Sequence, residues 1–332
     1  MEAPATPPGW ENAPERLYTI DAPDGRSRAW VCPEIGGNTI AYAVQTGDEW
    51  RQVLAVTTPE LLRESPSRYG LPILFPFPGH MRNQRYTWAG TEYHVPPTYG
   101  SGGTNVVHGF AHIRPWRLVR QTPTHIVCEL RTPDDLAPEQ AAAYPFTVRV
   151  LVSITIEDHQ LDVRLTAYNE GETVAPLGMG LHPYIGEGVL GPNRSVVKVD
   201  LPGATERVRP VPPSSEGAER RPAPPGPVAI VPLGQTMAVA RTDLGGHSEA
   251  VVRELPPIDG RAGWTVRFAF DSGYKHVLMF APDWQASLSI EPQTVTPGAA
   301  SYPEGHIDAL APLEPDASYA ATMTLRLVPP GE

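Results

Sequence analysis

The stretch FTVRVLVSITI, residues 146–156, alternates apolar and polar side chains along most of its length. The apolar residues that recur at every second position are Phe146, Val148, Val150, Val152, Ile154 and Ile156. Successive side chains of a β-strand point to opposite faces of a sheet, so a period of two predicts a strand with one face on a core. We therefore expect residues 146–156 to form a strand of a half-buried sheet.

The same alternation recurs at residues 161–166, 264–270 and 319–327. The chain holds 40 prolines and 30 glycines, which interrupt helices but suit short strands joined by turns. Helix signals are sparse: Thr58 and Pro59 form a cap followed by a first-turn proline, and residues 138–144 suit about two helical turns. The pattern predicts an all-β fold, a large antiparallel β-sandwich with few short helices.

A proline-rich segment at residues 202–232 raises the question of a second domain, because such segments often act as linkers. Its prolines include Pro210, Pro212, Pro213, Pro222, Pro224, Pro225 and Pro227. Strand-like patterning resumes on both sides, and no internal repeat of fixed period is present. We expect one domain over residues 1–332, with this segment as a surface excursion.

Charge and cysteine content narrow the class of protein. The formal net charge of −11 argues against nucleic acid or an anionic membrane as partner, whereas a neutral small molecule is compatible with it. Cys32 and Cys128 are too few for a disulfide framework, so we expect buried thiols and a reducing compartment. The N-terminus lacks a basic, apolar leader and no run of eighteen apolar residues occurs. We expect a cytoplasmic monomer or homodimer.

Three short regions carry polar residues that strand patterning does not explain. They are residues 70–93 with the continuation HGFAH at 108–112, GMGLHPY at 178–184, and LSIEPQT at 288–294. In the third region Glu291 follows the alternating Leu288 and Ile290, so its carboxylate is expected at a strand end with limited solvation. A poorly solvated carboxylate suits a general base, whereas the alternative is a surface glutamate paired with an arginine.

Two histidines are candidates for proton donation. His182 lies between glycine-rich turns and Pro183, and histidine donates protons readily near neutral pH. His108 precedes Gly109, which would let the backbone approach a ligand closely. The alternatives are a histidine at the core edge that bonds a carbonyl and a turn histidine without a function.

A metal site is the competing interpretation of the histidines, because His80, His94, His108 and His112 fall in one region. Gly109 and Pro115 oppose a helix that would present His108 and His112 on one face, and no cysteine or aspartate pair completes a ligand set. We therefore expect no metal. The sequence also lacks a Gly-x-Ser-x-Gly nucleophile motif and a glycine-rich phosphate loop after a strand.

Together, and in this order, the three regions resemble the aldose 1-epimerase family and its galactose mutarotase-like relatives, most closely the bacterial branch. The stretches that carry the resemblance are GLPILFP at 70–76, RYTWAG at 85–90, HGFA at 108–111 with RPW at 114–116, LHPY at 181–184 and IEPQT at 290–294. Each is a weak signal alone, but the series covers most of the chain.

The resemblance implies an isomerase that binds a hexose on the concave face of a β-sandwich and needs no cofactor. It implies that Glu291 takes the proton of the anomeric hydroxyl and that His182 protonates the ring oxygen. His108 and Gln293 would bind the sugar. Ring opening, rotation and closure with the two roles reversed would then interconvert the α and β anomers.

Two positions depart from the family pattern. An arginine commonly binds near the ring oxygen, but here an ungapped match gives His80, with Arg82 two residues later. If both lie on one strand they share a face, and we favour His80 for this role. A substrate-binding aspartate is usual in a Leu-Asp-Asp stretch, but residues 233–236 read LGQT, and Asp243 is a candidate out of register.

Three functions stay open at this point. A mutarotase acting on free sugars is preferred. A hexose-6-phosphate epimerase is the alternative, in which Arg82, Arg85 or Arg114 would meet the phosphate. The third is a carbohydrate-binding protein that has kept the fold and lost catalysis.

Overall fold

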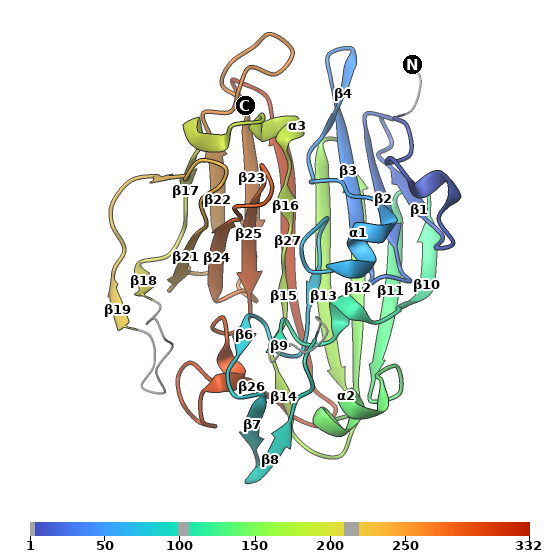
Figure 1. Cartoon of the computed structure of the whole chain (residues 1–332), viewed down its shortest axis with the longest axis vertical. Helices are drawn as coiled ribbons and strands as arrows, with labels where there is room; N and C mark the ends of the chain where they lie inside the picture. Colours follow the sequence, from blue (N-terminus) through green and yellow to red (C-terminus); the bar gives the residue numbers. More distant parts are fainter. Residues whose placement is uncertain (1–3, 99–105, 209–218) are drawn as a thin grey trace.

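The strand expected from residues 146–156 forms as β12 (Val148–Glu157), and its side chains alternate between buried and half-buried as the pattern predicts. It begins two residues late because its partner β11 ends at Thr132, which pairs with Val148 and precedes Pro133. The computed structural model describes residues 4–98, 106–208 and 219–332. Its architecture is a sandwich of antiparallel sheets (Figure 1).

In the described residues β12 belongs to a nine-stranded antiparallel sheet. Two other strands in it, β13 and β27, cover the alternating stretches at 161–166 and 319–327, and β23 covers most of 264–270. The strands in spatial order are β10 (Arg117–Thr122), β11 (His125–Thr132), β12, β13 (Gln160–Asn169), β27 (Ser318–Val328), β23 (Thr265–Phe270), β22 (Ser248–Arg253), β17 (Lys198–Asp200) and β20 (Val228–Ala229).

A second antiparallel sheet has eight strands within the described ranges. In spatial order they are β19 (Glu219–Pro222), β18 (Thr205–Val208), β21 (Met237–Thr242), β24 (His276–Ala281), β25 (Leu288–Gln293), β15 (Gly180–Leu181) and β5 (Ile73–Leu74), with β16 (Tyr184–Ile185) also pairing β25. One apolar cluster joins both sheets, with Val150 and Ile154 of β12 in the same core as Met279 of β24 and Ile290 of β25. Burial of this shared core holds the two layers together.

A third sheet, of four strands, packs against the nine-stranded sheet, where β1 and β2 contact β12. Its strands are β1 (Tyr18–Asp21), β2 (Ser27–Cys32), β3 (Asn38–Thr46) and β4 (Glu49–Gln52). Three two-stranded pairs complete the strands: β14 (Ala175–Leu177) with β26 (Ala311–Leu313), β6 (His80–Met81) with β9 (Val106–Val107), and β7 (Arg85–Trp88) with β8 (Thr91–His94).

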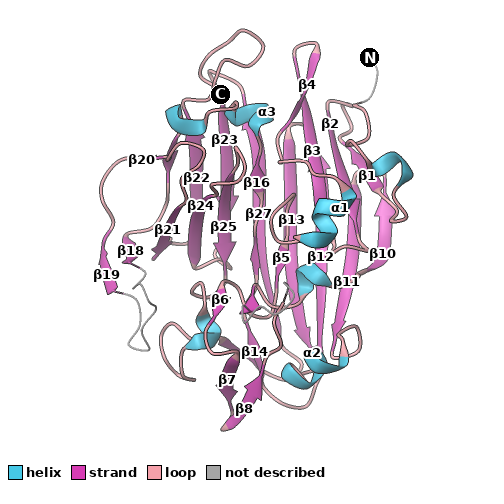
Figure 2. Ribbon diagram, in the orientation of Figure 1, coloured by secondary structure: helices cyan, strands magenta, loops and turns pink. Residues whose placement is uncertain are grey.

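Helices are few and short, as predicted, and Figure 2 shows them as small elements beside a structure made mostly of strands. The α-helices of the described residues are α1 (Pro59–Glu64), α2 (Pro138–Ala143) and α3 (Glu187–Leu190), and the 3-10 helices are η1 (Trp10–Asn12), η2 (Ala111–Ile113), η3 (Arg194–Val196) and η4 (Ala299–Ser301). Thr58 caps α1 through its side chain, which accepts a hydrogen bond from the Leu61 N–H at 3.4 Å. None of these helices is long and apolar enough to cross a membrane.

Cys32 and Cys128 are both free and buried, as expected, and burial raises the pKa of each thiol to about 12. In the proline-rich segment, β18 and β19 form the edge of the eight-stranded sheet, and β20 forms an edge of the nine-stranded sheet. Pro210, Pro212 and Pro213 lie outside the described residues. The described parts of this segment therefore extend the two large sheets.

Candidate active site

Glu291 lies on β25, where strand alternation separates core residues from a polar row. Leu288 and Ile290 belong to the core between the sheets. Ser289, Glu291 and Gln293 therefore point to the opposite face, away from that core. Glu291 is only 1% exposed, so its carboxylate is buried although it does not face the apolar core.

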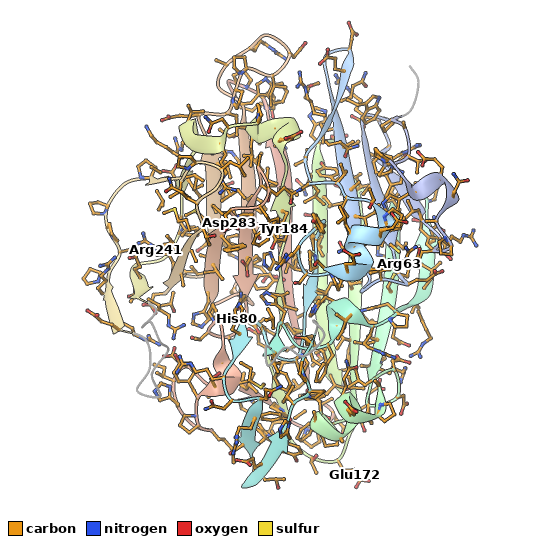
Figure 3. All side chains as sticks on the ribbon, in the orientation of Figure 1. Arg63, His80, Glu172, Tyr184, Arg241 and Asp283 are labelled. Atoms are coloured by element: carbon orange, nitrogen blue, oxygen red, sulfur yellow. The ribbon has the colours of Figure 1, made fainter. Side chains whose placement is uncertain are left out.

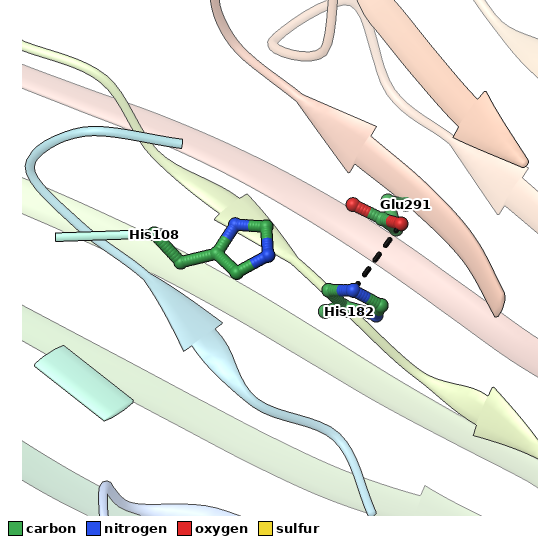
Figure 4. Close-up of side chains that lie close together, drawn as sticks. All are labelled: His108, His182 and Glu291. Atoms are coloured by element: carbon green, nitrogen blue, oxygen red, sulfur yellow. Dashed lines mark ion pairs between the residues drawn. The ribbon is translucent and has the colours of Figure 1, made fainter. Parts of the chain in front are cut away.

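His182 is held beside Glu291 by strand pairing. It lies between β15 and β16, and both of these strands pair with β25. The His182 Nε2 and Glu291 Oε1 atoms are 3.3 Å apart (Figure 4). Burial lowers the pKa of His182 to about 3, so burial by itself keeps the ring neutral near neutral pH.

Two further side chains fix the His182 ring, and neither was predicted from the sequence. The Ser289 hydroxyl lies 2.8 Å from Nδ1, and the Tyr184 hydroxyl lies 3.3 Å from Nε2. The Tyr184 ring also stacks on the imidazole, with the ring centroids 4.5 Å apart. Because the Glu291 carboxylate only accepts, the Nε2 proton is best placed between ring and carboxylate, with the Ser289 hydroxyl donating to Nδ1.

A sequence signal for both residues existed. Ser289 precedes Glu291 by two positions on a strand, so the two side chains had to share a face. Tyr184 follows His182 by two positions in another extended segment. The alternation that located the strands therefore also indicated which neighbours share the polar face.

His108 presents its ring to His182 from a strained loop position. The two ring centroids are 5.1 Å apart (Figure 4). The His108 backbone has a φ of 63°, which is uncommon outside glycine and costly to hold. Two hydrogen bonds with Gly79 hold it: the His108 N–H donates to the Gly79 carbonyl at 2.8 Å, and the Gly79 N–H donates to His108 Nδ1 at 3.1 Å.

This second bond sets the His108 tautomer. A ring nitrogen that accepts a hydrogen bond carries no proton, so the proton of the neutral ring is on Nε2. His108 is thereby a neutral N–H donor, which suits a sugar oxygen. Gly109 does permit a close backbone approach, but to the chain itself: a Cβ there would lie 2.4 Å from the Phe75 carbonyl oxygen.

Gln293 contacts Glu291 directly, because its Nε2 donates to Glu291 Oε2 at 3.2 Å. Its own Oε1 is buried and has no hydrogen-bond partner among the described residues. Gln293 therefore orients the carboxylate and retains an acceptor for a ligand hydroxyl.

His80 and Arg82 diverge, although the sequence allowed them to share a face. β6 ends at Met81, and His80 stands with its ring centroid 6.4 Å from that of His108. Arg82 instead lines a separate pocket of about 650 Å³ with Ser301 and Glu304. In Figure 3, His80 and Tyr184 both lie near the middle of the view, far from Glu172 at its lower end.

Asp243 is not among these residues. It is exposed and lies just past the end of β21, with a φ of 60°. Its negative charge acts on His276, the residue of β24 that pairs with Gln293. The structure thus places it near His276, with β24 between it and Gln293.

The donor atoms of His108, His182 and Glu291 all lie within 4.8 Å of one another, a spacing that a metal ion could use. Two histidines and a glutamate are a ligand set found in zinc sites. Metal binding would need an unprotonated Nε2 on His108, but the Gly79 N–H bond keeps the proton there. The hydrogen bonds present favour proton transfer over metal ligation.

Residues 16–188, slightly more than half of the chain, match the aldose 1-epimerase family. The chain belongs to this family. The matched part contains His80, His108 and His182, whereas Glu291 lies beyond it. The position of Glu291 beside His182 therefore comes from the tertiary structure.

The chain is similar in sequence to one relative over part of its length, and similar in fold to solved structures over most of its length. A stretch of 128 residues is 28% identical to the uncharacterised protein YihR of Escherichia coli K12 and covers 38% of this chain and 39% of that relative. An aldose epimerase homologue from C. elegans has a TM-score of 0.74 at 15% identity and covers 96% of this chain and 100% of that one. A putative aldose 1-epimerase from E. coli K12 has a TM-score of 0.72 at 18% identity, covering 94% and 99%.

Proposed function

We propose that this member of the aldose 1-epimerase family is a mutarotase that interconverts the α and β anomers of a hexose by acid/base ring opening and closure. One observation carries the proposal: a buried carboxylate and a buried imidazole lie 3.3 Å apart, with the N–H donor of His108 beside them. A base for the anomeric hydroxyl, an acid for the ring oxygen and a donor to a sugar oxygen are what this reaction needs.

The number of protons that Glu291 and His182 hold together decides how this pair would catalyse the reaction. A buried pair with a net negative charge is costly, so binding one proton stabilises the pair as a unit. With that proton on His182, the Glu291 carboxylate offsets the burial that otherwise keeps the ring neutral.

Ring opening then moves the proton through the sugar. Glu291 takes the proton of the anomeric hydroxyl while His182 gives its proton to the ring oxygen. The pair again holds one proton, now on Glu291, and the ring C–O bond is broken to leave an aldehyde. Rotation about the C1–C2 bond then exposes the other face of the aldehyde. The two proton transfers run in reverse and close the ring on that face, so the reaction needs no cofactor.

The test is Glu291→Gln, followed by polarimetry on fresh α-glucose and α-galactose. The amide keeps the shape but cannot accept the proton, so turnover should fall at least about 100-fold. Glu249→Gln, on the opposite large sheet, makes the same chemical change away from the site and serves as control. If Glu291→Gln keeps more than roughly a tenth of wild-type turnover, Glu291 is not the base.

A further inference from the structure

On the sheet face that carries Glu291, two arginines gather several strands away. Glu291 pairs with Leu278, Leu278 with Ala240, and Ala240 with Arg207. Arg207 in turn pairs with Arg220 on the edge strand β19. Residues directly opposite in paired strands share a face, so this row runs across one surface of the sheet from the carboxylate to the arginines.

Arg241, which follows Ala240 on β21, lies on the other face of the same sheet. Arg241 pairs with Val277, which belongs to the core between the sheets, so Arg241 points to the opposite face. It forms an ion pair with Glu206 at 3.0 Å. Arg241 is labelled in Figure 3 and provides a buried arginine for comparison, close in the sheet but on the wrong face for the sugar.

Arg207 and Arg220 converge on one carboxylate. Arg220 Nη2 lies 2.6 Å from Asp308 Oδ1, and Arg207 Nη2 lies 3.4 Å from Asp308 Oδ2. Burial opposes ionisation of Asp308, but the hydrogen bond from Thr296 and the two guanidinium groups outweigh it and lower its pKa. Two cations against one carboxylate leave a net positive charge.

The remaining neighbours do not cancel this charge within the buried cluster. Burial and Arg207 lower the pKa of His276 to about 4, so its ring is neutral near neutral pH. Asp243 still acts on His276, but it is exposed to solvent, which weakens the effect of its charge on the buried cluster. Arg207 is 5% exposed, and a net charge at such depth is costly unless something pairs with it.

Arg207 and Arg220 also have N–H groups that can donate hydrogen bonds to a ligand. Arg207 Nη2 contacts the Tyr302 hydroxyl at 3.2 Å, but its buried Nε–H has no hydrogen-bond partner among the described residues. The Arg220 side chain is 32% exposed, so its guanidinium is accessible while Asp308 holds one edge of it. A guanidinium held in this way is suited to a carboxylate or a phosphate.

The arrangement suits the far end of the sugar bound at Glu291. Three strand spacings, about 14 Å, separate the backbones of β25 and β18, and the arginine side chains extend from their own strands over part of that distance. Asp308 itself accepts a hydrogen bond at 2.7 Å from Thr296, three residues beyond Gln293. Leu278 and Ala240, which are 6% and 5% exposed, lie between these two places on the same face.

We propose that Arg207 and Arg220 bind an anionic group on the end of the sugar remote from C1, so that the preferred substrate is an anionic monosaccharide. This inference rests on the proposed mutarotase function. A neutral hydroxyl group would leave the excess positive charge of this cluster uncompensated, whereas a carboxylate or a phosphate pairs with it.

The experiment compares kcat/KM for mutarotation of α-glucose, glucose 6-phosphate and glucuronate. The wild-type protein should prefer at least one anionic sugar, and which one it prefers distinguishes phosphate from carboxylate. Arg220→Met, at a partly exposed position that tolerates change, should lower kcat/KM for that anionic sugar roughly 10- to 100-fold more than for glucose. Arg241→Met removes a buried arginine from the other face and should leave the ratio unchanged.

Binding measured by calorimetry in the Glu291→Gln background separates this inference from the proposed function. Anionic-sugar binding that Arg220→Met weakens, without turnover in the wild type, supports the subsite and overturns the mutarotase. Turnover of glucose with equal or poorer handling of both anionic sugars overturns the subsite and leaves the mutarotase standing. An equal effect of Arg220→Met on charged and neutral sugars also overturns it.

Discussion

Replacing Ser289 with alanine tests whether the proton on His182 depends on its hydroxyl partner. The Ser289 hydroxyl is 2.8 Å from His182 Nδ1 and both side chains are buried, so no water can readily replace it. A hydroxyl can accept from the protonated ring and donate to the neutral ring. It therefore serves both states of the proposed cycle, but the bond to the charged ring is the stronger one.

The size of the effect follows from that difference. Hydrogen bonds to charged groups contribute about 1.5–3 kcal/mol and those between neutral groups about 0.5–1.5 kcal/mol, so the difference of roughly 1–1.5 kcal/mol should lower kcat roughly 5- to 10-fold. The bond favours the protonated ring, so its removal lowers the pKa of His182 further. Activity that requires the proton should then be lost at a lower pH than in the wild type. The alkaline limb of the kcat/KM profile should therefore shift to lower pH.

The assay is polarimetry across pH on Ser289→Ala and Ser289→Thr, with Ser287→Ala as control. Ser287 is equally buried, two residues earlier, and contacts Gln285 instead of His182. Threonine keeps a hydroxyl and should restore much of the activity, while the control should keep the wild-type profile. A pH profile in Ser289→Ala that matches the wild type would refute the argument, even if the protein were less stable.

Two further predictions concern the proposed catalytic pair and the position expected to hold an arginine. Glu291→Gln and His182→Asn should be strongly non-additive, because either change interrupts the single-proton relay. A double variant much slower than either single variant in polarimetry would count against the shared proton. His80→Arg should flatten the alkaline limb of kcat/KM if His80 must be cationic, since arginine stays charged, whereas Arg82→Ala should have little effect because Arg82 lines a separate pocket. An unchanged limb in His80→Arg together with a collapse in Arg82→Ala would return the role to Arg82.

The strands could be predicted from local pattern because burial on one face imposes a period of two. β12, β13 and β27 all lie where the alternation indicated, and α1 begins at the cap formed by Thr58. The ends of strands were less certain, since β12 starts only where β11 offers a partner. Local pattern reports which face is buried, but it does not report where the neighbouring strand stops.

The candidate site was predictable in part. Glu291, His182 and His108 were selected from short motifs, and the structure brings all three together. The divergence of His80 and Arg82 was not predictable, because a two-residue strand and the bend after it separate their side chains. The hydrogen bond that sets the His108 tautomer comes from Gly79, and no sequence pattern links those two positions.

By itself the sequence determined the class of fold and the kinds of groups available for chemistry: alternating strands, a carboxylate and histidines in polar motifs. Only the tertiary structure decided which of these groups meet. β15 and β16 pair with β25 and so place His182 against Ser289 and Glu291, which are more than a hundred positions away in the chain. The arginines of β18 and β19 lie on the same face and are linked to β25 through four successive strand pairings. The physical reason is register: a shift of one residue in any of these pairings would turn every following side chain to the other face, and the packing of the whole core fixes that register.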